Sequence, residues 1–229
     1  MVERKISTEK YFIAGIITFL VFSLGFALGI ILDNVRLRWA ERINKEKEID
    51  YASLQLQYLY LSTLKETNES CFVLHTALEK AISELGESLE KFQLYMKESK
   101  LNKEEYSIIG RKYLLDNLKY WLFARKSKQE CDMDIVNILY FYSQEHCDIC
   151  PNQGVILTYF KKKFGEKLLV FPIDVDFEGI EPMITLLRSR YNVTSYPTII
   201  VEDVKYEGIV PKEKLDKIIC NLFKDKSLC

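Results

Sequence analysis

Two cysteines separated by two residues stand in the segment SQEHCDICPNQ, residues 143–153. Such a pair can exchange disulfides, bind a soft metal ion or close a structural loop. The residues that follow predict a helix over 154–165, which places the pair at its N-terminus. Unpaired backbone N–H groups and the helix dipole stabilise a thiolate there. We therefore expect a redox-active pair in which Cys147 is the nucleophile and Cys150 resolves the mixed disulfide.

The neighbours of the pair act on it in opposite directions. A protonated His146 would stabilise a Cys147 thiolate, whereas Asp148, between the two cysteines, would raise the pKa of the thiol. An equally simple interpretation makes His146 an exposed loop residue without a role. The sequence leaves this choice open.

Metal binding is the main rival to redox chemistry at this motif. A structural zinc site needs about four ligands, but the chain has one C-x-x-C and only two histidines, His75 and His146. We expect no metal and no cofactor. Copper handling by Cys147, Cys150 and His146 is an alternative, because soft thiolates bind Cu(I). A redox-silent binding module is the other alternative.

The composition excludes one class of partner and constrains the compartment. The chain has 229 residues and a formal charge of −1, so no basic excess indicates nucleic-acid binding. The six cysteines suit either a redox pair with structural disulfides in an oxidising compartment or a redox pair with buried thiols.

An uncharged apolar stretch runs over residues 11–32. At about 1.5 Å per residue it is about 33 Å long, which is enough to cross a bilayer core of about 30 Å. A cleaved signal peptide would have a shorter apolar core and a small-residue cleavage site after it. The sequence therefore predicts an uncleaved transmembrane helix. Gly25 and Gly29 form a G-x-x-x-G motif within it, which leaves open a homodimer with a second copy.

Helical composition follows the apolar stretch, since no proline occurs between residue 33 and about residue 127. Apolar residues spaced by three and four predict amphipathic helices around residues 74–96 and 109–122. We expect a stalk followed by a helical hairpin, together covering residues 33–130. The turn-forming residues 67–70 separate the stalk from the hairpin.

The pattern changes after Glu130 to that of an α/β domain. The β-branched and aromatic run over 134–143 predicts a buried strand. A helix, a strand over 167–176, a helix over 178–192, a strand pair over 197–208 and a helix over 211–223 follow. This order predicts parallel strands joined by a crossover helix, followed by an antiparallel hairpin.

This domain resembles the thioredoxin family over residues 134–224. The matching residues are FYSQEHCDICPNQ for the active-site strand and helix, PIDVD for the second strand and YNVTSYPTIIV for the proline loop. The resemblance implies an α/β fold with a central mixed sheet flanked by helices. It implies thiol–disulfide oxidoreductase activity on cysteine-containing proteins, together with a redox partner protein.

The resemblance also implies roles for the proline loop. Pro197 would be cis and would lie beside Cys147, where Tyr196, Pro197 and His146 are the candidate substrate-binding residues. The chain departs from the family pattern at His146, where tryptophan is usual, and at Asp148-Ile149, where Gly-Pro is usual. Phe141 replaces a buried acid and Pro172 replaces a lysine. These departures favour a specialised oxidase, isomerase or reductase outside the cytoplasm.

The remaining cysteines bear on the topology. Cys71 begins one hairpin helix and Cys131 follows the other, so an antiparallel hairpin brings them together. Cys220 and Cys229 can pair if the tail folds back. Such bridges persist in an oxidising compartment. We therefore expect a cytoplasmic N-terminal tail (1–10), the membrane helix (11–32), an extracytoplasmic helical region and thioredoxin-like domain, and a C-terminal tail (225–229). The Lys/Arg count around the membrane helix slightly favours the opposite orientation.

Overall fold

The structure is a computed structural model. It describes residues 12–13, 15–30, 32–33, 49, 53, 55–56, 60, 68–97 and 103–229. The chain separates into two units, Met1–Thr63 and Leu64–Cys229, and each is described by itself. The predicted N-terminal tail and most of the predicted stalk lie outside the described residues.

In the first unit, residues 15–30 are helical. The predicted membrane span over residues 11–32 includes Tyr11, Ala14 and Ile31, which lie outside the described residues. Among the described residues, no helix is both long enough and apolar enough to cross a bilayer. Membrane anchoring and a homodimer through Gly25 and Gly29 therefore stay predictions from the sequence.

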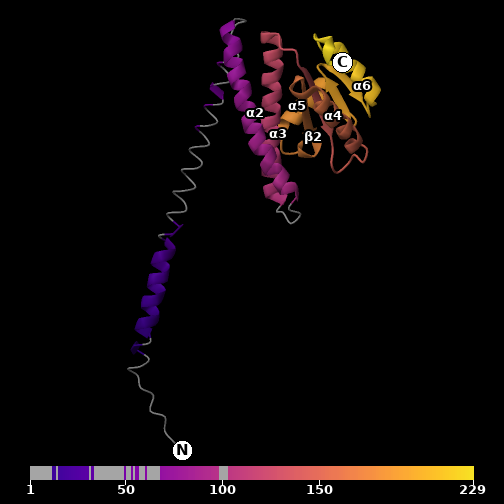
Figure 1. The fold of residues 1–229 in the computed structure, drawn as a ribbon. Helices are drawn as coiled ribbons and strands as arrows, with labels where there is room; N and C mark the ends of the chain where they lie inside the picture. Colours follow the sequence, from indigo (N-terminus) through magenta and orange to yellow (C-terminus); the bar gives the residue numbers. More distant parts are fainter. Residues whose placement is uncertain are drawn as a thin grey trace, which may run out of the picture. The chain divides into compact units, whose positions relative to one another are not determined.

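The second unit begins with the two hairpin helices, α2 (Asn68–Lys97) and α3 (Lys103–Cys131). They run side by side, with α3 between α2 and the sheet (Figure 1). The Phe92 ring stacks on the Tyr113 ring, with centroids 5.1 Å apart. Apolar side chains at helical spacing are buried on both helices: Leu74, Leu78, Ala81, Leu114, Leu118 and Trp121.

Two disulfides lie outside the C-x-x-C. Cys71 is bonded to Cys131 at the open end of the hairpin, with Cα atoms 5.5 Å apart. Cys131 is the last residue of α3, which continues through RKSK, because lysine and arginine are good helix formers. Cys220 is bonded to Cys229, with Cα atoms 5.8 Å apart.

A four-stranded mixed sheet forms the centre of the unit. Its strands are β1 (Val136–Tyr142), β2 (Leu168–Asp174), β3 (Thr198–Val201) and β4 (Val204–Glu207), in the order β2-β1-β3-β4. β1 is parallel to β2 and antiparallel to β3, and β3 and β4 are antiparallel. This is the α/β arrangement that the sequence predicted.

Helices cover both faces of this sheet. The remaining helices are α4 (Cys150–Phe164), α5 (Pro182–Tyr191) and α6 (Lys212–Leu222). Alternate residues of each strand point to opposite faces. One face packs against α3 and α5, through strand residues including Leu139, Phe141, Leu169, Phe171 and Ile200. The other packs against α4 and α6, through Val136, Ile138, Tyr140, Leu168 and Ile199.

Two helix boundaries differ from the predicted ones. α4 begins at Cys150 rather than at residue 154, because Pro151 fits the first turn of a helix, where its missing N–H is not needed. α5 begins at Pro182 rather than at residue 178. There the Glu181 carboxylate caps the helix by accepting a hydrogen bond from the Met183 backbone N–H at 3.1 Å.

Ion pairs hold the end of α3 to the β3–β4 turn. Arg125 donates two hydrogen bonds to the Asp203 carboxylate, at 2.8 and 3.0 Å. Lys128 donates to the Glu202 carboxylate at 2.7 Å, and the same oxygen accepts from the Asn137 backbone N–H at 2.8 Å. The hairpin helix is therefore fixed to the strand pair that follows the proline loop.

The packing of α3 makes a testable prediction at Gly110. A Cβ added at Gly110 would lie 2.3 Å from Cζ of the buried Phe177 ring, so Gly110→Ala must displace that ring. Overpacking of this kind costs about 1–3 kcal/mol, which exceeds the roughly 1 kcal/mol gained from helix propensity. We expect Gly110→Ala to lower the free energy of unfolding, measured by chemical denaturation.

Gly86, in α2, is the matched control. A Cβ built there has no heavy atom within 4 Å in the described structure. Gly86→Ala should therefore raise the free energy of unfolding by about 0.5–1 kcal/mol. Two substitutions with the same sign would contradict the close contact between α3 and Phe177.

Candidate functional site

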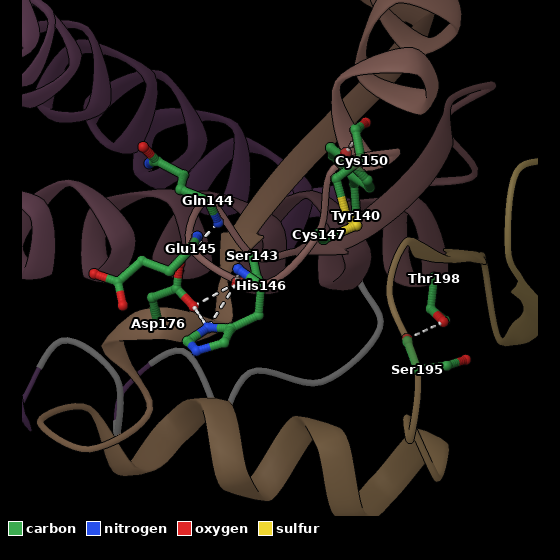
Figure 2. Close-up of a disulfide and its surroundings, with 10 residues drawn as sticks. All are labelled: Tyr140, Ser143, Gln144, Glu145, His146, Cys147, Cys150, Asp176, Ser195 and Thr198. Carbon is green, nitrogen blue, oxygen red and sulfur yellow. Dashed lines mark hydrogen bonds and ion pairs between the residues drawn. A yellow bond between two sulfur atoms is a disulfide. The ribbon is translucent and has the colours of Figure 1, made fainter.

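Cys147 and Cys150 are joined as a disulfide at the start of α4, with Cα atoms 5.4 Å apart. The Cys150 backbone N–H donates to the Cys147 carbonyl at 3.3 Å, which closes a turn through Asp148 and Ile149. Cys147 is 9% exposed and Cys150 is 1% exposed. Figure 2 shows the disulfide where the loop after β1 meets the helix. Cys147 is the more exposed residue of the pair, as expected for a nucleophile.

Cys150 is the first residue of α4, whereas the sequence predicted that this helix begins at residue 154. Residues 148 and 149 form a turn, so the helix does not begin before Cys150. Both sulfurs therefore lie at the helix N-terminus, where N–H groups without intrahelical partners favour negative charge.

A tyrosine of β1 is bonded to the second cysteine. The Tyr140 hydroxyl donates to the Cys150 backbone carbonyl at 2.5 Å, in a buried contact. The Tyr140 ring stacks on Tyr142, with centroids 5.2 Å apart. Burial raises the pKa of Tyr140 to about 12, so this hydroxyl stays protonated at neutral pH.

Asp176 holds the loop that leads to Cys147. Its carboxylate accepts from the Ser143 hydroxyl at 2.6 Å and from the backbone N–H groups of Gln144 and Glu145 at 2.7 and 3.0 Å. The Ser143 hydroxyl in turn accepts from the backbone N–H of His146 at 2.8 Å. Figure 2 shows these contacts converging on Asp176. One carboxylate therefore fixes the residues immediately before the nucleophile.

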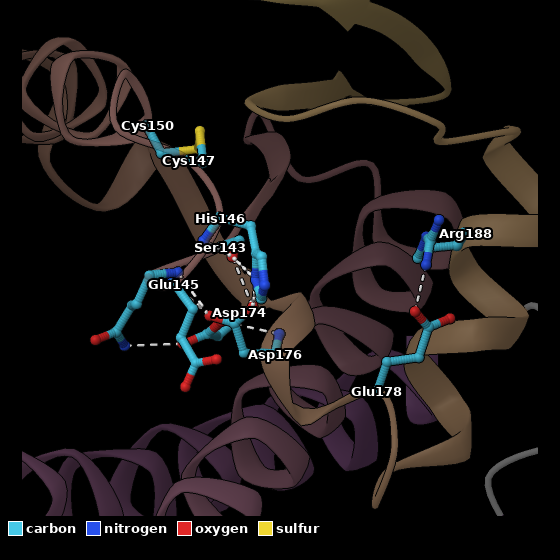
Figure 3. Close-up of polar contacts among 10 residues, drawn as sticks. Ser143, Glu145, His146, Cys147, Cys150, Asp174, Asp176, Glu178 and Arg188 are labelled. Carbon is cyan, nitrogen blue, oxygen red and sulfur yellow. Dashed lines mark hydrogen bonds and ion pairs between the residues drawn. A yellow bond between two sulfur atoms is a disulfide. The ribbon is translucent and has the colours of Figure 1, made fainter.

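A second carboxylate, that of Asp174, is hydrogen-bonded to Asp176 and to the same loop. It accepts from the Gln144 side-chain amide at 2.8 Å, and from the Asp176 backbone N–H at 3.1 Å (Figure 3). Burial raises the pKa of Asp174 to about 6, against the opposing hydrogen bond from the Asp176 N–H. Burial would also raise the pKa of Asp176, but hydrogen bonds from Ser143, Glu145 and Gln144 hold it below the usual range.

The raised pKa of Asp174 predicts how stability depends on pH. The folded state binds a proton at Asp174 up to about pH 6, whereas the unfolded chain releases it near pH 4. The folded state therefore loses stability as pH rises between these values. Asp174→Asn removes this loss. We expect the stability of the variant relative to wild type to grow by up to about 3 kcal/mol between pH 4 and pH 6, then stay constant.

Chemical denaturation at a series of pH values measures this difference. Asp148→Asn is the control, because Asp148 is an exposed carboxyl in the active-site turn. It should differ from wild type by no more than about 0.5 kcal/mol throughout. A pH-independent difference for Asp174→Asn would show that Asp174 does not titrate in this range.

His146 points away from the disulfide. Its Nδ1 lies 3.5 Å from the Asp176 carboxylate and 3.5 Å from the Ser143 hydroxyl. Its side chain is 75% exposed, and Figures 2 and 3 both show its ring on the Asp176 side. The geometry favours the interpretation of His146 as an exposed loop residue over direct stabilisation of the Cys147 thiolate.

The proline loop meets the site at the end of β1. The Tyr196–Pro197 peptide bond is cis, the isomer that the thioredoxin resemblance implies. Thr198 is paired with Phe141 in the sheet, which places Pro197 beside the start of the loop to Cys147. The Arg188 guanidinium carbon lies 5.6 Å from the centroid of the Tyr196 ring, and Arg188 also pairs with Glu178 (Figure 3).

Two positions that differ from the family pattern are structural here. Phe141 is fully buried on the α3 and α5 face, so it supplies no proton acceptor behind the cysteines. Pro172 lies in β2, an edge strand, where proline's missing N–H costs no ladder bond. The Pro172 carbonyl accepts from the Asn117 side chain at 2.8 Å. Neither residue can assist proton transfer at the pair.

Metal ligands do not gather around the pair. In the part of the chain that the structure describes, no three or more His, Cys, Asp or Glu side chains are grouped as a metal site. The ring of His146, which the copper alternative requires, lies toward Asp176.

The sequence analysis missed Ser143, Asp176 and Tyr140. A signal for Asp176 was present, because the acidic residues of PIDVD end a buried strand predicted to be parallel to β1. Loops at the carboxyl ends of neighbouring parallel strands lie together at one edge of a sheet. Nothing in the sequence pointed to Tyr140, because its hydrogen bond depends on how α4 packs on the sheet.

Comparisons with known proteins give similarity to thioredoxins at low identity. No protein-family model matches the chain, and no curated protein matches it. Among solved structures, the germline-specific thioredoxin Deadhead of Drosophila melanogaster is 24% identical, with 44% of this chain and 93% of that chain covered and a TM-score of 0.34. Chloroplastic thioredoxin z is 18% identical, with 43% and 88% covered and a TM-score of 0.34.

A thioredoxin-like protein from Clostridium perfringens is 20% identical, with 41% of this chain and 75% of that chain covered and a TM-score of 0.34. All three TM-scores are below 0.5.

Proposed function

We propose that the chain is a thiol–disulfide oxidoreductase whose thioredoxin-like domain acts through Cys147 and Cys150. The observation that carries the proposal is the disulfide at the N-terminus of α4, next to the end of β1 where the proline loop enters the sheet. In reduced form, this helix end would favour a thiolate. Tyr196 and Pro197, in the loop before β3, are the proposed substrate-binding residues.

The reaction follows from the order of the two sulfurs. In the reducing direction, the Cys147 thiolate attacks a disulfide of a protein substrate, forms a mixed disulfide and releases one substrate thiolate. The Cys150 thiolate then attacks the Cys147 sulfur, re-forms the intramolecular disulfide and releases the second substrate thiolate. The substrate gains two electrons and the protein pair loses them. An oxidase uses the same steps in reverse. An isomerase combines forward and reverse steps on one substrate.

The position that carries a buried acid in the thioredoxin pattern is the buried Phe141 in this chain, which offers no carboxylate to the pair. Proton uptake and release at Cys150 would therefore depend on solvent reaching the opened site, which favours a slower specialised enzyme. A redox partner protein would return the pair to its starting state. The direction of net electron flow is set by that partner and by the reduction potential of the pair.

We further propose that the domain lies outside the cytoplasm, anchored by the apolar segment over residues 11–32 with the N-terminus inside. Support comes from the cysteines: all six, each within residues 68–229, are paired as disulfides. Structural disulfides persist in oxidising compartments. The orientation is tested on intact cells by reducing the disulfides and then labelling with a membrane-impermeant thiol reagent. Labelling that occurs only after lysis would show that the domain lies in the cytoplasm.

Redox titration tests the enzymatic proposal. The full chain, purified in mild detergent, is equilibrated in glutathione buffers of graded potential, and the fraction of the Cys147–Cys150 disulfide is measured by peptide mass. We expect one reversible two-electron transition, together with catalysed reduction of oxidised glutathione or a protein disulfide. A pair that stays oxidised at every potential and catalyses nothing would favour the redox-silent binding module. Metal analysis of the same sample tests the copper alternative.

A further inference from the structure

Tyr140 connects the central strand to the second cysteine. It is two residues from the end of β1 and only 6% exposed. Its hydroxyl reaches across to the first residue of α4 and donates to the Cys150 carbonyl at 2.5 Å. The contact spans ten residues of sequence, over the whole loop and turn that carry Cys147.

Several features fix this contact in place. The Tyr140 ring lies on the face of the sheet that α4 covers. It stacks on the Tyr142 ring at a 19° interplanar angle. Gly154, one turn along α4, faces the tip of the ring: a Cβ added there would lie 3.9 Å from Tyr140 Cε1 and 4.0 Å from the hydroxyl oxygen. The ring therefore rests against the first turn of the helix, and its position determines where that turn sits.

The hydrogen bond from Tyr140 does more than satisfy a buried hydroxyl, because the atom that accepts it belongs to Cys150. The Cys150 carbonyl belongs to the residue that carries the second sulfur, and its amide closes the turn back to Cys147. When the disulfide opens, the two sulfurs must separate to van der Waals distance, and one side of the turn must move. Tyr140 holds the Cys150 side to the sheet, so the movement falls on the more exposed Cys147 side.

We propose that Tyr140 is a positioning residue that holds Cys150 in place to resolve the mixed disulfide. The inference rests on the proposed function and assigns Tyr140 to its second step. In that step the Cys150 thiolate attacks the Cys147 sulfur, the bond from Cys147 to the substrate sulfur breaks, and the substrate leaves as a thiolate. Attack by Cys147 on the substrate comes earlier and does not require Cys150 to be in place.

Tyr140→Phe tests this assignment, because it keeps the ring and removes only the hydroxyl. The reduced full chain is mixed with oxidised glutathione and quenched with acid at increasing times. Peptide mass then gives the reduced, glutathione-bound and disulfide forms of the pair. We expect the rate of attack to stay within about twofold of wild type. Resolution should slow about three- to tenfold, the usual effect of one lost hydrogen bond, so the glutathione-bound form accumulates.

Tyr142→Phe is the matched control. It removes a phenol hydroxyl from the same strand and the same ring stack, but the hydroxyl that donates to the Cys150 carbonyl is that of Tyr140. Tyr142→Phe should leave the ratio of the two rates unchanged. The pH profile of attack should be the same in Tyr140→Phe and wild type, because the substitution does not touch Cys147.

The outcomes separate this inference from the proposed function. A wild-type chain that forms no mixed disulfide would overturn both. A wild-type chain that cycles normally, with a Tyr140→Phe variant that matches it, would overturn only the role of Tyr140. Equal slowing of attack and resolution, or the same change in Tyr142→Phe, would show that Tyr140 only supports the fold.

Discussion

Cys147→Ser is expected to reduce thiol–disulfide exchange by the chain to the uncatalysed rate, a loss of at least about a hundredfold. The serine hydroxyl is not ionised at neutral pH, whereas the thiolate is the attacking species. Because Cys147 is the more exposed cysteine of the pair and precedes the helix, Cys150 cannot replace it as the first nucleophile. This loss is measured as the decrease in the rate at which thiols are released from a model protein disulfide.

Cys150→Ser is the informative counterpart. It leaves attack intact and removes resolution, so mixed disulfides between Cys147 and the substrate should accumulate. Non-reducing electrophoresis and peptide mass identify the trapped sulfur. Trapping at position 150 in Cys147→Ser, rather than at position 147 in Cys150→Ser, would reverse the assigned roles. Full activity in Cys147→Ser would remove the oxidoreductase proposal.

Removal of the Cys71–Cys131 disulfide is expected to lower the free energy of unfolding by about 4 kcal/mol. The bond closes a loop of 60 residues, and the chain-entropy model gives a larger stabilisation for a longer loop. The Cys71→Ser, Cys131→Ser double variant avoids a free thiol, and chemical denaturation of the full chain measures the loss. Such a loss is a large fraction of the typical stability of a domain.

The tail disulfide provides a matched control. Cys220 and Cys229 are separated by nine positions, so the same model gives about 2–3 kcal/mol for the Cys220→Ser, Cys229→Ser double variant. A tail bond that contributes more than the hairpin bond would contradict the loop-length argument. Neither double variant touches the Cys147–Cys150 turn, so both should retain the redox transition of that pair.

Local patterns in the sequence were sufficient for most of the fold. The C-x-x-C, the apolar spacing of the hairpin and the β-branched strand over 134–143 each lie within a few consecutive residues. Burial of an apolar face dictates such patterns at every position of an element, so the type of element can be predicted without its neighbours. The pairing of Cys71 with Cys131 followed from the antiparallel hairpin, because helices of similar length bring their ends together.

Boundaries were less well predicted than element types. The first turn of α4 contains no apolar repeat of its own, and its start is set by the 147–150 turn. The α5 start depends on a cap by Glu181, which is one of several acidic residues in this stretch of the sequence. One or two hydrogen bonds decide such positions, and a periodicity of 3.6 residues does not register them.

The detailed site was decided by tertiary structure. Asp176 reaches Ser143 and its neighbours because β1 and β2 are parallel and pair Tyr142 with Asp174, so the two loops leave the sheet at the same edge. Tyr140 reaches Cys150 only because α4 packs on the face of the sheet to which even-numbered residues of β1 point. The C-x-x-C pair can therefore be recognised from consecutive residues of the sequence alone. The position of the pair in the fold depends on strand register and helix packing, which bring together residues 10 to 33 positions apart.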